Sequence, residues 1–217
     1  MLISLSRCLR LCCLATLFVA PAALEAQVSG SVGLLAGYYQ PLGHFDPASI
    51  YVTSLPAKPS DLRGVLKGVT GHLSFGGRYG VDAQLSNAGS TIPTAVTPAG
   101  PRGPTKVSVD MATLEGVYDV SPTPQRYQIW LGAGPALVRH GGDAYAPYGN
   151  PTSVGGALGI GLAVPLGPHF QIATNFNTVW YTLDVGMPAA YQRNPGPLEH
   201  GAQRDALLQI GLLWLHP

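Results

Sequence analysis

Large apolar side chains recur on alternate positions along residues 155–183, on both sides of a turn that contains Pro165 and Pro168. Before the turn, Leu158, Ile160 and Leu162 share one face, whereas glycine and alanine fill the other. After the turn, phenylalanine, isoleucine and tryptophan alternate with glutamine and asparagine. Alternation with a period of two indicates β-strands that have two different faces, so the whole segment predicts a β-hairpin.

The same alternation recurs along the chain after about residue 27. It predicts eight strands, at about 28–39, 67–76, 79–86, 107–120, 126–138, 155–164, 170–183 and 205–215. The connections between these strands are alternately long and short. This order predicts antiparallel neighbours, with tight turns at one end of the sheet and four longer loops at the other.

Charged residues make up only 11% of the chain, against about 25% in an ordinary soluble domain. Strands of about ten residues match the ~9–11 residues that cross a bilayer at a tilt of ~45°. Because lipid offers no partner to free backbone groups, such a sheet must close on itself. We therefore expect an all-β fold, an eight-stranded antiparallel up-and-down transmembrane β-barrel with its large face in lipid. A soluble lipocalin-like barrel would need the reverse, with large apolar side chains inside and charges outside.

The first 26 residues have the features of a secretory signal peptide. Two arginines precede an apolar run at residues 11–23, and Ala26 suits a signal peptidase. All three cysteines lie in this segment, so residues 27–217, the expected barrel domain, have no thiol chemistry. Without the signal peptide the formal charges balance, which argues against a nucleic-acid partner. The expected location is the cell outer membrane.

Parity along the strands assigns several charged residues to the interior, where an isolated charge is costly and must be paired. We expect an interior polar network of ion pairs and hydrogen bonds from Arg78, Asp82, Glu115, Arg126 and Asp205. Aromatic residues near the strand ends face lipid and predict interfacial girdles. They are Tyr38, Tyr79, Tyr118, Tyr127, Phe170, Trp180 and Trp214.

A few large apolar residues do not follow the alternation. Trp130, Leu207 and Leu213 fall on the face that is otherwise small or polar. The segment 107–120 changes parity near Met111, which predicts a β-bulge at that position.

Candidate catalytic and metal-binding residues are few. His72 and Ser74 lie two apart on the inward face, with Asp82 or Glu115 as an orienting acid, a pattern open to a hydrolase. The run Arg-His-Gly-Gly-Asp at 139–143 supplies only two possible metal ligands, and so do His44 and Asp46. We therefore expect both segments to be exposed loops. Nucleophile elbows, phosphate loops and zinc patterns are missing from the sequence. We therefore assign no catalytic, cofactor-binding or metal-binding residue and expect no cofactor.

The chain resembles the small outer-membrane β-barrel proteins of bacteria, the OmpA-like and OmpX-like group. The resemblance rests on the signal peptide, the hairpins SFGGRYGVDAQLS and LEGVYDVSPTPQRYQIWLGAGPALV, and the last strand ALLQIGLLWL. It implies a barrel that is embedded in outer-membrane lipid and assembled by the barrel-insertion machinery. It does not select an activity, because this fold hosts structural proteins, adhesins, narrow pores and lipid-modifying enzymes.

We therefore expect a non-enzymatic outer-membrane protein with a structural or surface-interaction role. Its extracellular loops would bind an extracellular ligand or surface partner, because rigid scaffolds generally present recognition in loops. Three alternatives stay open at this point: a narrow pore, a barrel enzyme that modifies lipid A, and a soluble ligand-binding barrel.

Overall fold

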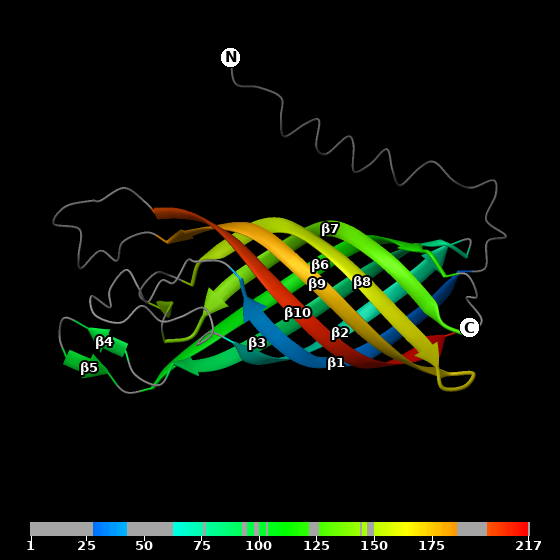
Figure 1. Cartoon of the computed structure of the whole chain (residues 1–217), viewed down its shortest axis with the longest axis horizontal. Coiled ribbons are helices and arrows are strands. Elements are labelled where there is room, and N and C mark those ends of the chain that lie inside the picture. The colour runs from blue at the N-terminus through cyan, green and yellow to red at the C-terminus, as the bar shows by residue number, and fades with distance from the viewer. Residues whose placement is uncertain are drawn as a thin grey trace, which may run out of the picture.

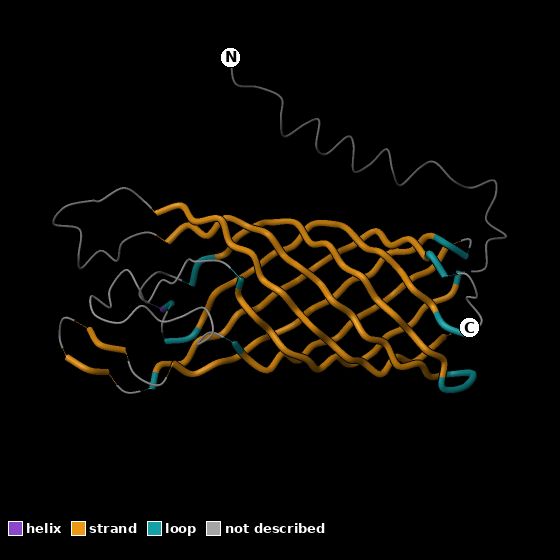
Figure 2. The backbone as a smooth tube through the Cα atoms, viewed as in Figure 1, coloured by secondary structure: helices purple, strands orange, loops and turns teal. Residues whose placement is uncertain are grey.

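Eight strands form a closed antiparallel barrel in the order β1-β10-β9-β8-β7-β6-β3-β2 (Figure 1 and Figure 2), as predicted. The computed structural model describes residues 28–42, 63–75, 77–92, 95–97, 100–102, 104–121, 126–143, 145–146, 150–185 and 199–216. The predicted signal peptide and the candidate ligands at 44 and 46 lie outside these residues. The barrel strands are β1 (Ser29–Pro41), β2 (Gly64–Phe75), β3 (Tyr79–Ile92), β6 (Thr105–Asp119), β7 (Gln128–Gly141), β8 (Thr152–Pro165), β9 (Phe170–Val185) and β10 (Glu199–His216).

The first and last strands close the barrel. β1 pairs with β10 from Gly30↔His216 to Pro41↔Asp205. Closure lets the strands pair on both sides, as lipid requires of any backbone that crosses it. A separate small hairpin, β4 (Ala95–Thr97) with β5 (Gly100–Arg102), lies beyond the barrel wall at the end that carries the long connections (Figure 1).

The strands run further at the long-loop end than the alternation predicts. β3 continues to Ile92 and β10 begins at Glu199, whereas the pattern places these limits at 86 and 205. Past the membrane neither strand face meets lipid, so no alternation of large and small residues is imposed there. The backbone ladder nevertheless continues, because hydrogen bonding does not depend on side-chain type.

The outer wall of the barrel carries the large apolar side chains. Leu34 is 71% exposed, Leu85 60% and Leu114 52%, along a wall built almost entirely of such residues. An apolar surface of this extent marks contact with lipid rather than water. This is the reverse of the arrangement that a soluble lipocalin-like barrel requires. Among the described residues, no helix combines the length and hydropathy needed to cross a bilayer.

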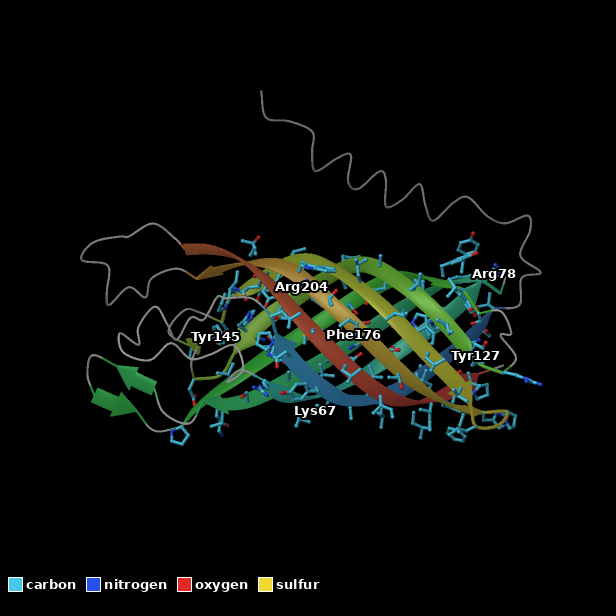
Figure 3. All side chains as sticks on the ribbon, in the orientation of Figure 1. Lys67, Arg78, Tyr127, Tyr145, Phe176 and Arg204 are labelled. Carbon is cyan, nitrogen blue, oxygen red and sulfur yellow. The ribbon has the colours of Figure 1, made fainter. Side chains whose placement is uncertain are left out.

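Aromatic side chains bound this apolar belt at the short-turn end. The rings of Tyr79 and Tyr118 lie 5.2 Å apart on neighbouring strands. Phe170 and Trp214 face outward next to each other in the β9–β10 ladder, and Tyr127 lies just before β7 (Figure 3). Rings with an apolar body and a polar tip favour the membrane interface.

A second boundary lies at the loop end. Tyr38 faces outward on β1, and the guanidinium of Arg204 lies 5.3 Å over the ring of Trp180. Between Phe75 and Lys67 the wall of β2 rises by roughly 20 Å, given ~3.3 Å per residue and a tilt of ~45°. This height is close to the ~25 Å apolar band of outer-membrane barrels.

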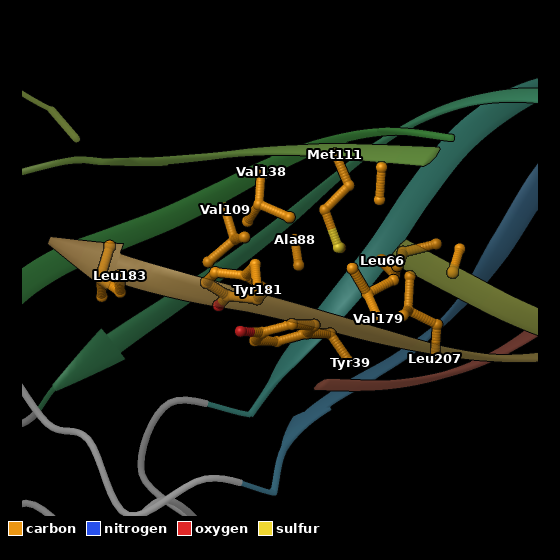
Figure 4. Packing of buried hydrophobic residues seen from close by; sticks show 12 residues of the cluster. Tyr39, Leu66, Ala88, Val109, Met111, Val138, Val179, Tyr181, Leu183 and Leu207 are labelled. Atoms are coloured by element: carbon orange, nitrogen blue, oxygen red, sulfur yellow. The ribbon is translucent and has the colours of Figure 1, made fainter. Parts of the chain in front are cut away.

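The interior changes character along the barrel axis. Toward the short turns it is lined by buried polar side chains, as the alternation predicts. Toward the loops, where a small or polar lining was also expected, an apolar cluster fills it (Figure 4). Here both strand faces carry large residues, so alternation cannot distinguish them. The cluster comprises Tyr39, Leu66, Ala88, Val109, Met111, Ala136, Val138, Ala157, Val179, Tyr181, Leu183 and Leu207.

This apolar interior explains the residues that broke the pattern. The predicted bulge is wrong, because β6 keeps one continuous register with β3 from Tyr79↔Tyr118 to Ile92↔Thr105. Met111 faces the apolar cluster, as does Leu207. Leu213 belongs to a second buried group at the short-turn end, and Trp130 packs against that group.

We expect Leu114→Lys to lower the free energy of unfolding by about 2–4 kcal/mol, because Leu114 faces lipid midway between the two boundaries. Val65→Lys, beyond Lys67 at the loop-end boundary, should cost only about 0–1 kcal/mol. Urea unfolding in lipid vesicles, followed by tryptophan fluorescence, measures both. Equal losses at the two positions would contradict this placement of the belt.

Candidate functional site

The structure separates the five residues of the predicted interior network. Asp82, Glu115 and Asp205 are buried inside the barrel. Arg78 and Arg126 are exposed in the short turns, so they do not join the three carboxylates in a buried network. Parity assigns a side chain to one face only within a paired ladder, and both arginines precede the first paired residue of their strand.

Arg78 joins the interfacial girdle instead. Its Nη1 donates a hydrogen bond to the hydroxyl of Tyr118 at 3.3 Å. Figure 3 labels Arg78 at the short-turn end of the barrel. The hydrogen bond to Tyr118 raises the pKa of Arg78 above its usual value, so the guanidinium stays charged at the membrane surface. All lysines and arginines whose side chains the structure describes are exposed. The described interior therefore holds three buried carboxylates with no lysine or arginine beside them.

Near the short turns, neutral donors serve the first of these carboxylates. The Oγ1 of Thr70 donates to Oδ1 of Asp82 at 3.1 Å. The Nδ1 of His72 lies 3.9 Å from the same oxygen. Glu115 pairs directly opposite Asp82 in the β3–β6 ladder, so the two acidic side chains share one inner surface.

Asp205 is the centre of a second buried group, toward the loops. The hydroxyl of Tyr181 donates to its Oδ2 at 2.8 Å and lies 3.1 Å from Nε2 of His140. Tyr39 also hydrogen-bonds Asp205, and the ring of Tyr145 packs 4.9 Å from that of His140. This Asp205 cluster ties β1, β7, β9 and β10 together beside the apolar cluster.

His140 was expected in an exposed loop, and this expectation is wrong. It is only 3% exposed and points inward from β7. Its parity matches that of Val138, which is also buried, so extending the β7 alternation by two residues would have placed it correctly. Arg139, between them, faces outward.

The bare faces of β7 and β8 make room for long side chains from other strands. A Cβ built at Gly132 would lie 2.5 Å from Oε2 of Glu115, and one at Gly159 would lie 2.9 Å from the same atom. A Cβ at Gly161 would collide with the indole ring of Trp130. The glycines on this wall are therefore needed for the interior to be filled.

Side chains also span the lumen between its two zones. The Nδ2 of Asn177 on β9 lies 3.5 Å from Oε1 of Gln84 on β3, and these strands are not neighbours in the barrel. The apolar cluster follows on the loop side. The described interior is thus packed by side chains in both zones.

His72 and Ser74 line a small cavity at the short-turn mouth of the lumen, and Arg78, Asp119, Gln128 and Trp130 also contribute to its lining. Its volume of about 20 Å³ accommodates roughly one water molecule. Both candidate residues face the lumen, whereas acyl chains lie against the outer wall, so this geometry does not support a lipid hydrolase. Within the described ranges, no three His, Cys, Asp or Glu side chains are grouped so that they could hold a metal ion.

Gly161→Ala should lower the free energy of unfolding by about 1–3 kcal/mol, because the added methyl group displaces the indole of Trp130. The matched control is Gly116→Ala on the outer wall, where the nearest atom to a new Cβ is 3.9 Å away. Gly116→Ala should leave the free energy of unfolding nearly unchanged. In a Trp130→Val background the cost of Gly161→Ala should shrink, and an unchanged cost would show that the glycine is not required by the ring.

Tyr181→Phe should lower the free energy of unfolding by about 1–3 kcal/mol, because it removes a donor from the fully buried carboxylate of Asp205. Tyr118→Phe removes an exposed hydroxyl and should change it by less than about 0.5 kcal/mol. Urea unfolding of both variants in the same vesicles provides the measurement. A neutral Tyr181→Phe would mean that Asp205 finds another donor.

Comparison with known proteins shows which solved structures share this fold. No protein-family model matches the chain, and no curated protein does. Solved structures match in fold: Neisserial surface protein A has 14% identity and a TM-score of 0.55, covering 85% of this chain and 96% of its own. The outer membrane protein OprG from Pseudomonas aeruginosa has 12% identity and a TM-score of 0.54, covering 87% and 95%. The chain is therefore a small eight-stranded β-barrel of the outer-membrane type.

Proposed function

We propose that the protein is a structural or surface-interaction component of the outer membrane that acts through its loops. The observation that carries this proposal is the filled interior. A narrow pore needs a continuous polar path, whereas here the apolar cluster occupies the lumen at the loop end. The barrel then serves as a rigid scaffold, and the connections between its strands are the part that can bind other molecules.

The strand extensions at the loop end support this role. β3, β9 and β10 continue past the belt, and the β4–β5 hairpin stands beyond the barrel wall (Figure 1). The long connections therefore start from paired strands that stand clear of the lipid. With the short turns toward the periplasm, the loops meet the cell exterior, where they would bind a surface partner or an extracellular ligand.

The proposal includes export and assembly. Residues 1–26 would be removed as a signal peptide, and the barrel-insertion machinery would place residues 27–217 in the outer-membrane lipid. No catalytic step is included, because His72 and Ser74 open only onto a cavity of about 20 Å³.

Two measurements on the full chain, and one on a loop-trimmed chain, test this function. In membrane fractions, the unboiled protein should run as a compact band that shifts on boiling. In planar bilayers it should show no steady single-channel conductance, because the lumen is packed. A conductance that is retained after loop trimming would overturn the proposal in favour of a pore.

Complementation separates the structural role from the surface-interaction role. Cells that lack the protein would receive either the full chain or a chain with residues 43–62 and 186–198 replaced by short Gly-Ser linkers. Rescue of outer-membrane permeability by both chains would assign a structural role. Rescue of surface adherence by the full chain alone would assign the function to the loops. Failure of the full chain in both assays would overturn the proposal.

A further inference from the structure

Four polar side chains interrupt the apolar outer wall in a single row. The ladder pairs Lys67 with Asn87, Asn87 with Asp110, and Asp110 with Arg139, across β2, β3, β6 and β7. All four face outward, and Lys67 stands on the outside of the barrel in Figure 3. The row is about 14 Å long, given a strand spacing of ~4.8 Å. It lies where the belt ends toward the loops.

Within this row Asp110 stands between a neutral neighbour, Asn87, and a cation, Arg139. The Nδ2 of Asn87 donates to Oδ1 of Asp110 at 2.6 Å. Across the described part of the chain, neither Lys67 nor Arg139 lies within 4.0 Å of a carboxylate. At a membrane boundary the low dielectric strengthens attraction to any anion within reach. Among the described residues, the row therefore carries two cations against one carboxylate, and neither cation forms an ion pair with it.

An apolar groove runs from the row into the belt. It has a volume of about 450 Å³ and is lined by the four polar residues and by the outward row below them. That lower row is Val69, Leu85, Ala112 and Leu137, so the small Ala112 leaves a notch between two leucines. A larger groove of about 770 Å³ continues from Val69 and Leu85 toward the short turns.

We propose that this groove binds a phosphate-bearing lipid of the leaflet at the loop end. The phosphate contacts Lys67 and Arg139 from the lipid side, where these two cations outnumber the single carboxylate of Asp110, and an acyl chain follows the notch at Ala112 down the wall. Arginine offers a phosphate two parallel hydrogen bonds, and lysine adds a mobile point charge. The proposal needs a barrel embedded in lipid and does not depend on what the loops bind.

Charge complementarity favours a lipid over a second copy of the barrel. Among the strand residues whose side chains are described, Asp110 is the only outward carboxylate. A second copy would therefore offer no acidic row to meet Lys67 and Arg139. The groove also crosses the belt along its height, as an acyl chain does.

Native mass spectrometry of the full chain from neutral detergent micelles tests the proposal. The micelles contain equal amounts of phosphatidic acid and phosphatidylcholine. Wild type should retain one phosphatidic acid in preference. The Lys67→Gln/Arg139→Gln variant should lose at least about tenfold in affinity, since it gives up two charge-assisted contacts. Both side chains are exposed, so the heat-shifted gel band should be unchanged.

Two further variants control for general surface charge and for groove shape. Lys106→Gln/Arg204→Gln removes the same charge from exposed positions outside the groove and should leave retention unchanged. Ala112→Leu fills the notch and should lower phosphatidic acid retention with both cations intact. The proposal would be overturned if Lys106→Gln/Arg204→Gln lost as much phosphatidic acid as Lys67→Gln/Arg139→Gln. It would also be overturned if wild type retained phosphatidylcholine equally well, or formed a dimer that excludes lipid. Binding of inorganic phosphate without the lipid preference would overturn it as well.

Discussion

Every other feature of this molecule depends on the pairing of β1 with β10. Without that pairing the sheet would expose two rows of unpaired backbone groups to lipid, at a cost of several kcal/mol for each group. Once the ladder closes from Gly30↔His216 to Pro41↔Asp205, each strand has one face in lipid and one face in the lumen. The two faces are then subject to different physical constraints. The outer face must match the thickness and chemistry of the bilayer, and the inner face must fill a narrow cylinder.

The inner face fills the narrow lumen by placing long side chains over glycines, which have no side chain of their own. Glu115 and Trp130 extend over Gly132, Gly159 and Gly161, where a Cβ would meet them too closely. Toward the loops the same space is taken by aliphatic side chains and by the Asp205 cluster. Both solutions fill the lumen, the first with buried polar side chains and the second with apolar side chains that exclude water. A barrel filled in this way keeps its shape while its loops vary, which is what a surface scaffold needs.

Sequence reasoning succeeded where one physical rule governed a residue and failed where two rules overlapped. Leu34 and Leu114 face lipid because only lipid accepts a large apolar residue at every second position of a strand. Arg78 was expected in the buried interior, but it lies in the turn before β3, where its guanidinium is exposed and reaches the hydroxyl of Tyr118. Met111 was misread as a bulge because the loop-end interior is as apolar as the wall outside it. The Asp205 cluster could be predicted only in part, since the contact between Tyr181 and His140 joins strands that are distant in the sequence.

The separation of charge between the two faces follows from the same geometry. In the interior even Glu115 needs glycines opposite it, so a longer arginine would need still more empty wall. Lysine and arginine instead lie outside, where their flexible stems cover apolar surface and their charged ends reach the interface. Carboxylates are shorter, and inside the barrel they accept hydrogen bonds from hydroxyl groups such as those of Thr70 and Tyr181. Among the described residues, the outer wall at the loop end therefore carries several cations and one carboxylate, that of Asp110. Two of these cations, Lys67 and Arg139, lie on the groove for which we propose a lipid, so the charges that the narrow lumen excludes remain available on the outer wall.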